Sequence, residues 1–134
     1  MIYVLDTNTL VYFFKGQGSV AATLLDTPPV QVAVPSVVVY ELETGIRKST
    51  QPEKRTRQLG ALLEAARVLS FDRWCASEAA RIRAELEQKG TPIGSIDVLI
   101  AGTVLAHDGV LVTHNVTEFS RISGLRIVDW YGEK

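Results

Sequence analysis

Short apolar runs alternate along the chain with longer segments of mixed polarity, a pattern that predicts strands separated by helices. The first run, Ile2–Asp6, is continuously apolar rather than alternating, which is typical of a parallel strand covered on both faces. The predicted fold is therefore α/β, a three-layer sandwich with a mostly parallel central sheet flanked by helices. Strands are expected at Ile2–Asp6, Val30–Val34, Val68–Ser70, Val110–Thr113 and Arg126–Val128.

Capping and helix-breaking residues indicate where the intervening helices begin and end. Ser19, Asp72 and Ser95 each precede a helical pattern and are expected to cap it, while Gly90 is expected to end a helix in the left-handed conformation. No repeat, linker or low-complexity segment interrupts the chain, so residues 1–134 are expected to form one domain. Helices are expected at 7–14, 19–26, from 35–36 through Glu41, 52–66, 72–90 and 95–106.

Four carboxylates lie where apolar chain turns polar, each at the edge of a predicted core element. Asp6 closes the first strand, and Glu41 lies in the helix that follows the second. Asp97 opens an apolar helix, and Glu118 follows the fourth strand. Functional groups in open α/β sheets gather beyond the carboxyl ends of the strands. The four side chains are therefore expected to converge on one cation site.

Each carboxylate also has a simpler explanation. Asp6 is a good helix N-cap, and Asp97 would favour the positive end of a helix. Asn115 and Glu118 have the spacing of a capping box. Glu41 is harder to explain, because it shares an apolar helix face and has no basic residue within one turn. A shared site explains all four positions together.

Converging carboxylates would need a cation. Two like charges at about 4 Å repel by roughly 4 kcal/mol at an effective dielectric of about 20. Oxygen ligands suit Mg²⁺, with Mn²⁺ as an alternative, and the spacing of the two histidines and one cysteine does not match a zinc site. Such an ion can activate water to attack a phosphodiester. Five polar residues are expected to orient water, metal or phosphate around the site, although helix capping is the simpler role for Ser36: Thr7, Asn8, Ser36, Thr113 and Asn115.

The charge distribution adds a possible nucleic-acid surface. The net charge is −1, but residues 47–89 hold ten basic and six acidic side chains. This basic segment would hold a phosphate backbone if cations neutralise the acids, and otherwise it is a solvated helix face. The single cysteine, Cys75, suits a reducing cytoplasm. No signal peptide or membrane-spanning stretch is predicted.

Four segments, taken in order, carry a resemblance to a known family. They are 4–8 (VLDTN), 36–42 with Gly45, 93–101, and 111–119 followed by 124–126 and 129–130. Together they resemble the PIN-domain ribonucleases of the VapC toxin family from end to end. Asp6, Glu41 and Asp97 match the acidic triad of that family. Many relatives have Asp at the position of Asn115, so here Glu118 offers the nearest fourth carboxylate.

The resemblance implies the toxin of a type II toxin–antitoxin pair. Such toxins are Mg²⁺-dependent endoribonucleases, several of which cut structured RNA, including tRNA. They are usually homodimers that a VapB-like antitoxin holds inactive. An antitoxin helix would fit an apolar groove, unless the same residues are simply core. The residues expected in that groove are Tyr12, Phe13, Phe14, Val20, Leu24 and Leu25.

Other functions fit the residues less well. A haloacid dehalogenase phosphatase needs an aspartate where this chain has Asn8, and a receiver domain needs a late lysine that is missing between Lys89 and Lys134. A dinucleotide-binding domain needs a glycine-rich turn after the first strand. The remaining alternative is a catalytically inactive PIN-like scaffold that binds RNA or a partner protein.

Overall fold

Five parallel strands form one sheet in the order β3-β2-β1-β4-β5. The structure is a computed structural model that describes residues 1–132. Most strand residues are buried, as expected for a sheet with both faces covered. The strands are β1 Tyr3–Leu5, β2 Val32–Pro35, β3 Arg67–Leu69, β4 Val110–Val112 and β5 Arg126–Val128.

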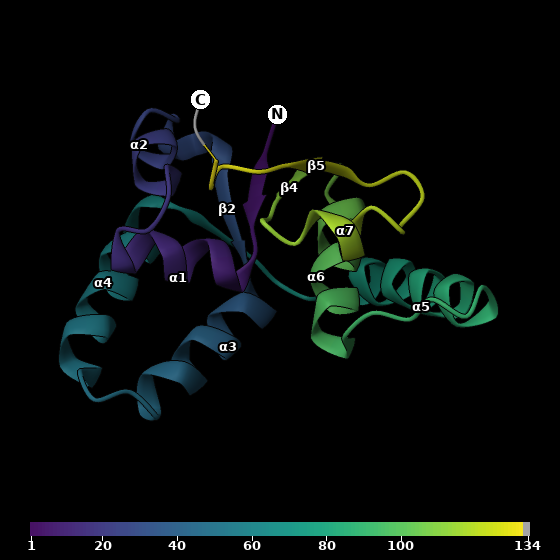
Figure 1. Cartoon of the computed structure of the whole chain (residues 1–134), viewed down its shortest axis with the longest axis horizontal. Helices are drawn as coiled ribbons and strands as arrows, with labels where there is room; N and C mark the ends of the chain where they lie inside the picture. Colours follow the sequence, from purple (N-terminus) through teal and green to yellow (C-terminus); the bar gives the residue numbers. More distant parts are fainter. Residues whose placement is uncertain (133–134) are drawn as a thin grey trace.

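The helices lie on both faces of the sheet, because the chain first adds strands on one side of β1 and then crosses back to add strands on its other side. Connections between parallel strands are almost always right-handed, so reversing the direction of travel moves the helices to the opposite face. Figure 1 shows α1, α3 and α4 on one side of the strands and α5 and α6 on the other. The helices are α1 Thr7–Lys15, α2 Val20–Leu25, α3 Ser36–Arg47, α4 Pro52–Ala65, α5 Arg73–Gln88, α6 Ser95–Ala106 and α7 Val116–Phe119.

The reversal of strand order at β1 and β4 determines where a site can form. The chain moves from β1 through β2 to β3, then crosses to β4 on the other side of β1 and continues to β5. Leu5 pairs with Val112, so these two strands end side by side. Helices leave their carboxyl ends toward opposite faces and open a crevice there. Asp6 and Thr113 directly follow the two strands and lie at this crevice.

The second layer of helices is packed unusually closely. α6 is apolar on nearly every side and lies between the sheet and α5. A Cβ atom placed on Gly102 would lie 2.8 Å from the Ala79 Cβ and 2.9 Å from the Cys75 carbonyl oxygen, so glycine is needed for α5 and α6 to approach. Cys75 is fully buried beside this contact. This close contact fixes the position of α6, the helix that carries Asp97, against α5.

The predicted fold class is confirmed, and the differences are local. Ser19 and Ser95 do not cap helices through their side chains: the Ser19 side chain makes no cap bond, and Ser95 is already the first helical residue after Gly94. The start of the second predicted strand is a 3-10 turn at Pro29–Gln31, because proline φ angles suit a turn and proline has no N–H for a ladder. The short helix α7 was not predicted, since four residues show no periodicity. Within residues 1–132, no helix has the length and apolar character needed to cross a membrane.

Candidate active site

Asp6 is a buried carboxylate at the carboxyl end of β1. Its side chain caps α1 by accepting a hydrogen bond from the Thr9 backbone N–H, with Oδ1 at 2.9 Å. Only 4% of the residue is exposed. Burial raises the pKa of Asp6, while hydrogen bonds from Thr113 and Thr9 oppose that rise. The simple capping role is therefore real, but capping alone does not require the carboxylate to be this deeply buried.

Glu41 reaches the same crevice from α3. The Thr7 hydroxyl donates a hydrogen bond to Glu41 Oε1. Thr7 follows Asp6 directly, so this contact holds the glutamate beside the carboxyl end of β1. The inward-facing glutamate expected from the sequence thus has a hydroxyl partner rather than a basic one.

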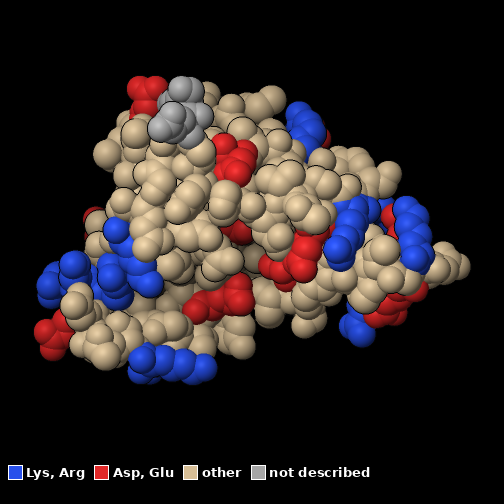
Figure 2. Space-filling model, viewed as in Figure 1, with Lys and Arg blue, Asp and Glu red and all other residues tan. Residues whose placement is uncertain are grey.

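Asp97 is a partly buried carboxylate that responds to the charges of the other three acids. It lies in the first turn of α6 and is partly buried. Its pKa is raised to about 6, first by burial and then by the negative charges of Asp6, Glu118 and Glu41. Like charges raise a carboxyl pKa only when they are close. Figure 2 shows acidic side chains gathered near the middle of this face, with Lys and Arg side chains to both sides.

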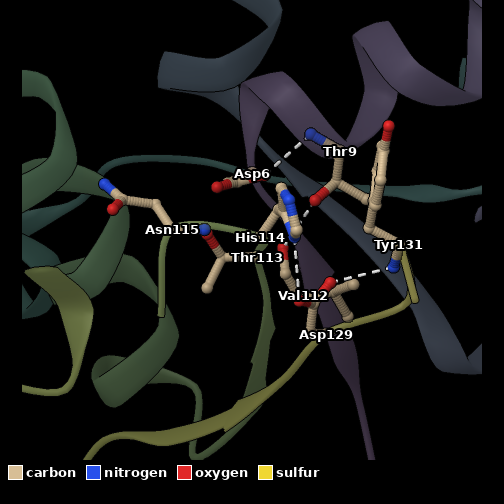
Figure 3. A network of polar contacts seen from close by, with 8 residues as sticks. All are labelled: Asp6, Thr9, Val112, Thr113, His114, Asn115, Asp129 and Tyr131. Atoms are coloured by element: carbon tan, nitrogen blue, oxygen red, sulfur yellow. Dashed lines mark hydrogen bonds and ion pairs between the residues drawn. The ribbon is translucent and has the colours of Figure 1, made fainter. Parts of the chain in front are cut away.

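Glu118 is positioned through Thr113 and Asn115. The Thr113 hydroxyl accepts a hydrogen bond from the Asn115 backbone N–H at 3.0 Å, and the Asn115 side-chain Nδ2 donates to Glu118 Oε2 at 2.8 Å. The Asn115 side chain makes no cap bond to α7, so the capping-box explanation is wrong. The Glu118 charge instead contributes to the raised pKa of Asp97, and Figure 3 shows Thr113 and Asn115, from the loop after β4, on the same side of the sheet end as Asp6.

The donor chemistry of this site suits a hard divalent cation. All four candidate ligands are carboxylates, and their mutual repulsion favours a bound positive charge. In the part of the chain that the structure describes, no three His, Cys, Asp or Glu side chains form a ready-made metal site. Glu41 and Glu118 are each held by a hydrogen bond to Thr7 or Asn115. Ligation would require these two side chains to exchange those hydrogen bonds for contacts with the ion.

Comparison with known proteins shows what this arrangement belongs to. Residues 3–125 match the sequence pattern of the PIN domain family. The chain belongs to the PIN domain family. It is 35% identical over 128 residues to the tRNA(fMet)-specific endonuclease VapC of Salmonella typhimurium, covering 96% of this chain and 97% of that protein. It is 36% identical over 132 residues to ribonuclease VapC2 of Rickettsia felis, covering 97% and 98%.

A solved structure supports the same relationship at the level of the fold. The Rickettsia felis VapBC2 complex bound to a DNA fragment from its promoter contains a chain with a TM-score of 0.89 and 36% identity. The match covers 97% of this chain and 99% of that one. The sequence resemblance to VapC-type PIN domains is thus confirmed, and nearly the whole VapC length is present.

Only some of the residues predicted to support the site contact its acids. Thr7, Thr113 and Asn115 contact the acids or one another, as described above. Ser36 does not cap α3, because Pro35 occupies the cap position; its Oγ accepts a hydrogen bond from the Phe71 backbone N–H at 3.1 Å. Asn8 is exposed. Whether these residues act in catalysis stays a prediction.

Asp129 was missed as a charged neighbour of the site. Its charge contributes to the raised pKa of Asp6, although less than burial does. Asp129 Oδ2 lies 2.9 Å from His114 Nδ1, and its Oδ1 accepts from the Tyr131 backbone N–H at 2.8 Å (Figure 3). The signal was available, because Asp129 directly follows β5 just as Asp6 follows β1.

Proposed function

We propose that this chain is a VapC toxin, a metal-dependent endoribonuclease that cleaves RNA with water as the nucleophile. The proposal is supported by the contacts that hold Glu41 on Thr7, beside Asp6, and Glu118 on Asn115, and by the charges of these three acids, which add to the effect of burial in raising the pKa of Asp97. Asp6, Glu41, Asp97 and Glu118 are the proposed ligands, with Mg²⁺ as the ion and Mn²⁺ as an alternative. The names of the VapC relatives support the nuclease activity.

The side chains around the crevice define how the residues would work. A divalent ion, when bound, supplies positive charge that activates water and offsets charge developing on the phosphate. Asp6 is held rigidly by its cap to α1, so it provides a fixed anchor. Glu41 and Glu118 are held by single hydrogen bonds to polar neighbours and can exchange them for new contacts. The crevice therefore combines fixed and adjustable carboxylates.

The proposed activity predicts strict dependence on a divalent cation. Purified protein incubated with total bacterial RNA in Mg²⁺ is expected to produce discrete fragments, and excess EDTA is expected to abolish them because the carboxylates alone cannot neutralise the developing charge. Readdition of Mg²⁺ or Mn²⁺ should restore cleavage. Gel analysis of the RNA checks this result, and fragments that persist in EDTA would contradict it.

A tRNA is the proposed substrate class, since the Salmonella relative is named as a tRNA(fMet)-specific endonuclease. The competing function is a PIN-like scaffold that binds RNA or a protein without cutting. Loss of cleavage on chelation, with RNA binding retained in a carboxylate variant, favours the enzyme. Tight binding without cleavage in any divalent cation favours the scaffold.

We further propose that a VapB-like antitoxin helix occupies an apolar groove between α1, α2 and α4. The groove has a volume of about 430 Å³. Leu25 lines it and is 80% exposed, whereas Val20 is fully buried and Tyr12 is not among the lining residues, so the predicted set is corrected at those two positions. Solved relatives are VapBC complexes, which supports a protein partner of this kind.

A homodimeric state and a cytoplasmic location stay predictions.

Leu25→Glu tests the partner groove. The charge should weaken binding of the VapB-like partner by about tenfold or more, because a charged side chain in an apolar groove is desolvated without a partner. Val30→Glu is the matched control, since Val30 is 85% exposed but does not line the groove. Calorimetry of the two variants checks the result. Equal affinities would contradict the assignment.

A further inference from the structure

A second hollow begins at the acidic site and extends from it along α1 and α3. Its volume is about 460 Å³, within the range of about 300–1,000 Å³ typical of small-ligand sites. Thr7 and Glu41 belong to both the hollow and the acidic site. A strand of RNA whose scissile phosphate lies at the acids could therefore continue into this hollow, which we call the α1–α3 groove.

The lining of the α1–α3 groove combines apolar, polar and basic side chains. The apolar members offer a surface for a nucleobase, and the basic members offer charge for a phosphate. The hydroxyl and amide groups can hydrogen-bond to base edges. Besides Thr7 and Glu41, the groove is lined by Val11, Phe14, Lys15, Leu42, Gly45, Ile46, Ser49, Thr50, Gln51 and Arg55.

Gly45 leaves the α3 wall of this groove bare. It lies one turn after Glu41 on the same face of the helix, and Ser49 lies two residues beyond the end of α3 at Arg47. A Cβ atom placed on Gly45 would meet no described atom within 4 Å apart from its chain neighbours and the nearby backbone of its own helix. Glycine is unfavourable inside a helix, and here no packing contact requires it. The missing side chain is explained if a ligand approaches the backbone at this point.

Arg55 is held in place at the groove. Its Nη1 donates to the Phe14 carbonyl oxygen at 3.2 Å and to Gln58 Oε1 at 2.8 Å. A guanidinium has five N–H groups, so these two contacts leave others for a phosphate. Lys15 ends α1 on the same groove and is exposed. Figure 2 shows basic side chains beside the acidic patch, over α1 and α4.

We propose that the α1–α3 groove binds the RNA nucleotide next to the cleaved phosphate. Its base lies against the apolar side chains and the bare backbone at Gly45, and its phosphate is held by Lys15 and Arg55. The identity of this ligand rests on the proposed ribonuclease function. The groove would then contribute to the choice of cleavage site, since a base that fits it places the adjoining phosphate at the acids.

Gly45→Leu tests the subsite by filling the groove. Gly60→Leu is the matched control, because Gly60 is also a helical glycine whose added Cβ would meet no described atom within 4 Å outside its chain neighbours and its own helix backbone. It lines a different hollow with Thr56 and Leu63. Binding is measured by fluorescence anisotropy with a labelled oligoribonucleotide of mixed sequence in Mg²⁺, each chain also carrying Asp97→Asn to prevent cleavage. Gly45→Leu should weaken binding by about tenfold, and Gly60→Leu should leave it within about twofold of the parent.

A second variant separates loss of the phosphate contact from loss of shape. Lys15→Gln should weaken binding and reduce the slope of log affinity against log salt by about 0.7, as expected for one fewer phosphate contact on a single strand. If Gly45→Leu and Gly60→Leu bind RNA equally well, the proposal that the α1–α3 groove binds an RNA nucleotide is contradicted. A protein segment would then be the remaining candidate ligand for the groove. If Gly45→Leu weakens binding while the chain with Asp97 intact cuts no RNA, the groove is an RNA-binding site, but the ribonuclease proposal fails and so does the assignment of the groove to the nucleotide beside a cleaved phosphate.

Discussion

Asp97→Asn is expected to abolish RNA cleavage and at the same time to stabilise the metal-free protein. Removing a residue that hydrogen-bonds to a metal ligand lowers metal affinity or activity by about 10- to 100-fold. Removing a ligand itself should therefore reduce the rate of cleavage by at least about a hundredfold. Asparagine keeps the shape of the side chain but removes the negative charge. The decrease is measured as the initial rate of RNA cleavage in saturating Mg²⁺.

The stabilisation follows from the raised pKa of Asp97. The folded-state pKa of about 6 lies above the ordinary value of 3.8, so the folded protein holds this proton more tightly than the unfolded chain does. The carboxyl therefore favours folding below about pH 4, and this contribution is lost as the pH rises to 6. Because Asp97 is partly exposed, solvent screening reduces the effect to about 1 kcal/mol at pH 7.

Thermal unfolding in EDTA provides the measurement for this second effect. The unfolding midpoint of Asp97→Asn should exceed that of the unmodified chain at pH 7, and the difference should shrink toward pH 4. Mg²⁺ should stabilise the unmodified chain more than the variant, since only the former keeps all four carboxylates. A variant that is less stable than the unmodified chain at pH 7 would mean that Asp97 has a structural role rather than a ligand role.

Two substitutions of Asp6 are expected to distinguish its role in catalysis from its role in stabilising the fold. Asp6→Asn keeps an N-cap acceptor for the Thr9 N–H, because asparagine caps helices about as well as aspartate. Asp6→Ala removes the cap and should lower the free energy of unfolding by about 1 kcal/mol. Both variants should lose cleavage by at least about a hundredfold, since both lack the buried carboxylate.

Denaturant unfolding and the RNA-cleavage rate, measured on the same samples, check this pair. Equal loss of cleavage with unequal stability supports a ligand role for the Asp6 carboxylate. Cleavage by Asp6→Asn at the rate of the unmodified chain would show that Asp6 acts only as a helix cap. In that case the carboxylate cluster would not be the catalytic centre.

The sequence predicted the fold because it follows from local rules, whereas the convergence of the four acids on one cation site stays a prediction, since no three of them form a ready-made metal site in the described residues. Apolar runs without alternation indicate covered parallel strands, and residues that follow such strands meet at one edge of the sheet. Asp6 and Glu118 were located by this rule. The pKa of Asp97 responds to the other three carboxylates, which agrees with that expectation.

The groove residues could not be found in the same way. Lys15 and Arg55 are 40 positions apart, and only the packing of α4 beside α1 places both at one hollow. The role of Ser36 depended on a partner from the loop after β3, which no local pattern reveals. Gly45 carries no side chain, so its significance emerges only from the empty space around it. These features arise from tertiary contacts, not from periodicity.

The chemistry of the cleaved ends tests the central claim most directly. RNA fragments made by the unmodified chain in Mg²⁺ should end in a linear phosphate monoester on one side of the cut and a free hydroxyl on the other. We expect these ends because the site supplies carboxylates for a cation and water is the proposed nucleophile. Mass spectrometry of the fragments distinguishes these from ends with a 2′,3′-cyclic phosphate. Linear phosphate and hydroxyl ends that require Mg²⁺ and Asp97 would support metal-dependent hydrolysis. Cyclic phosphate ends would show attack by the RNA's own 2′-hydroxyl and would contradict it.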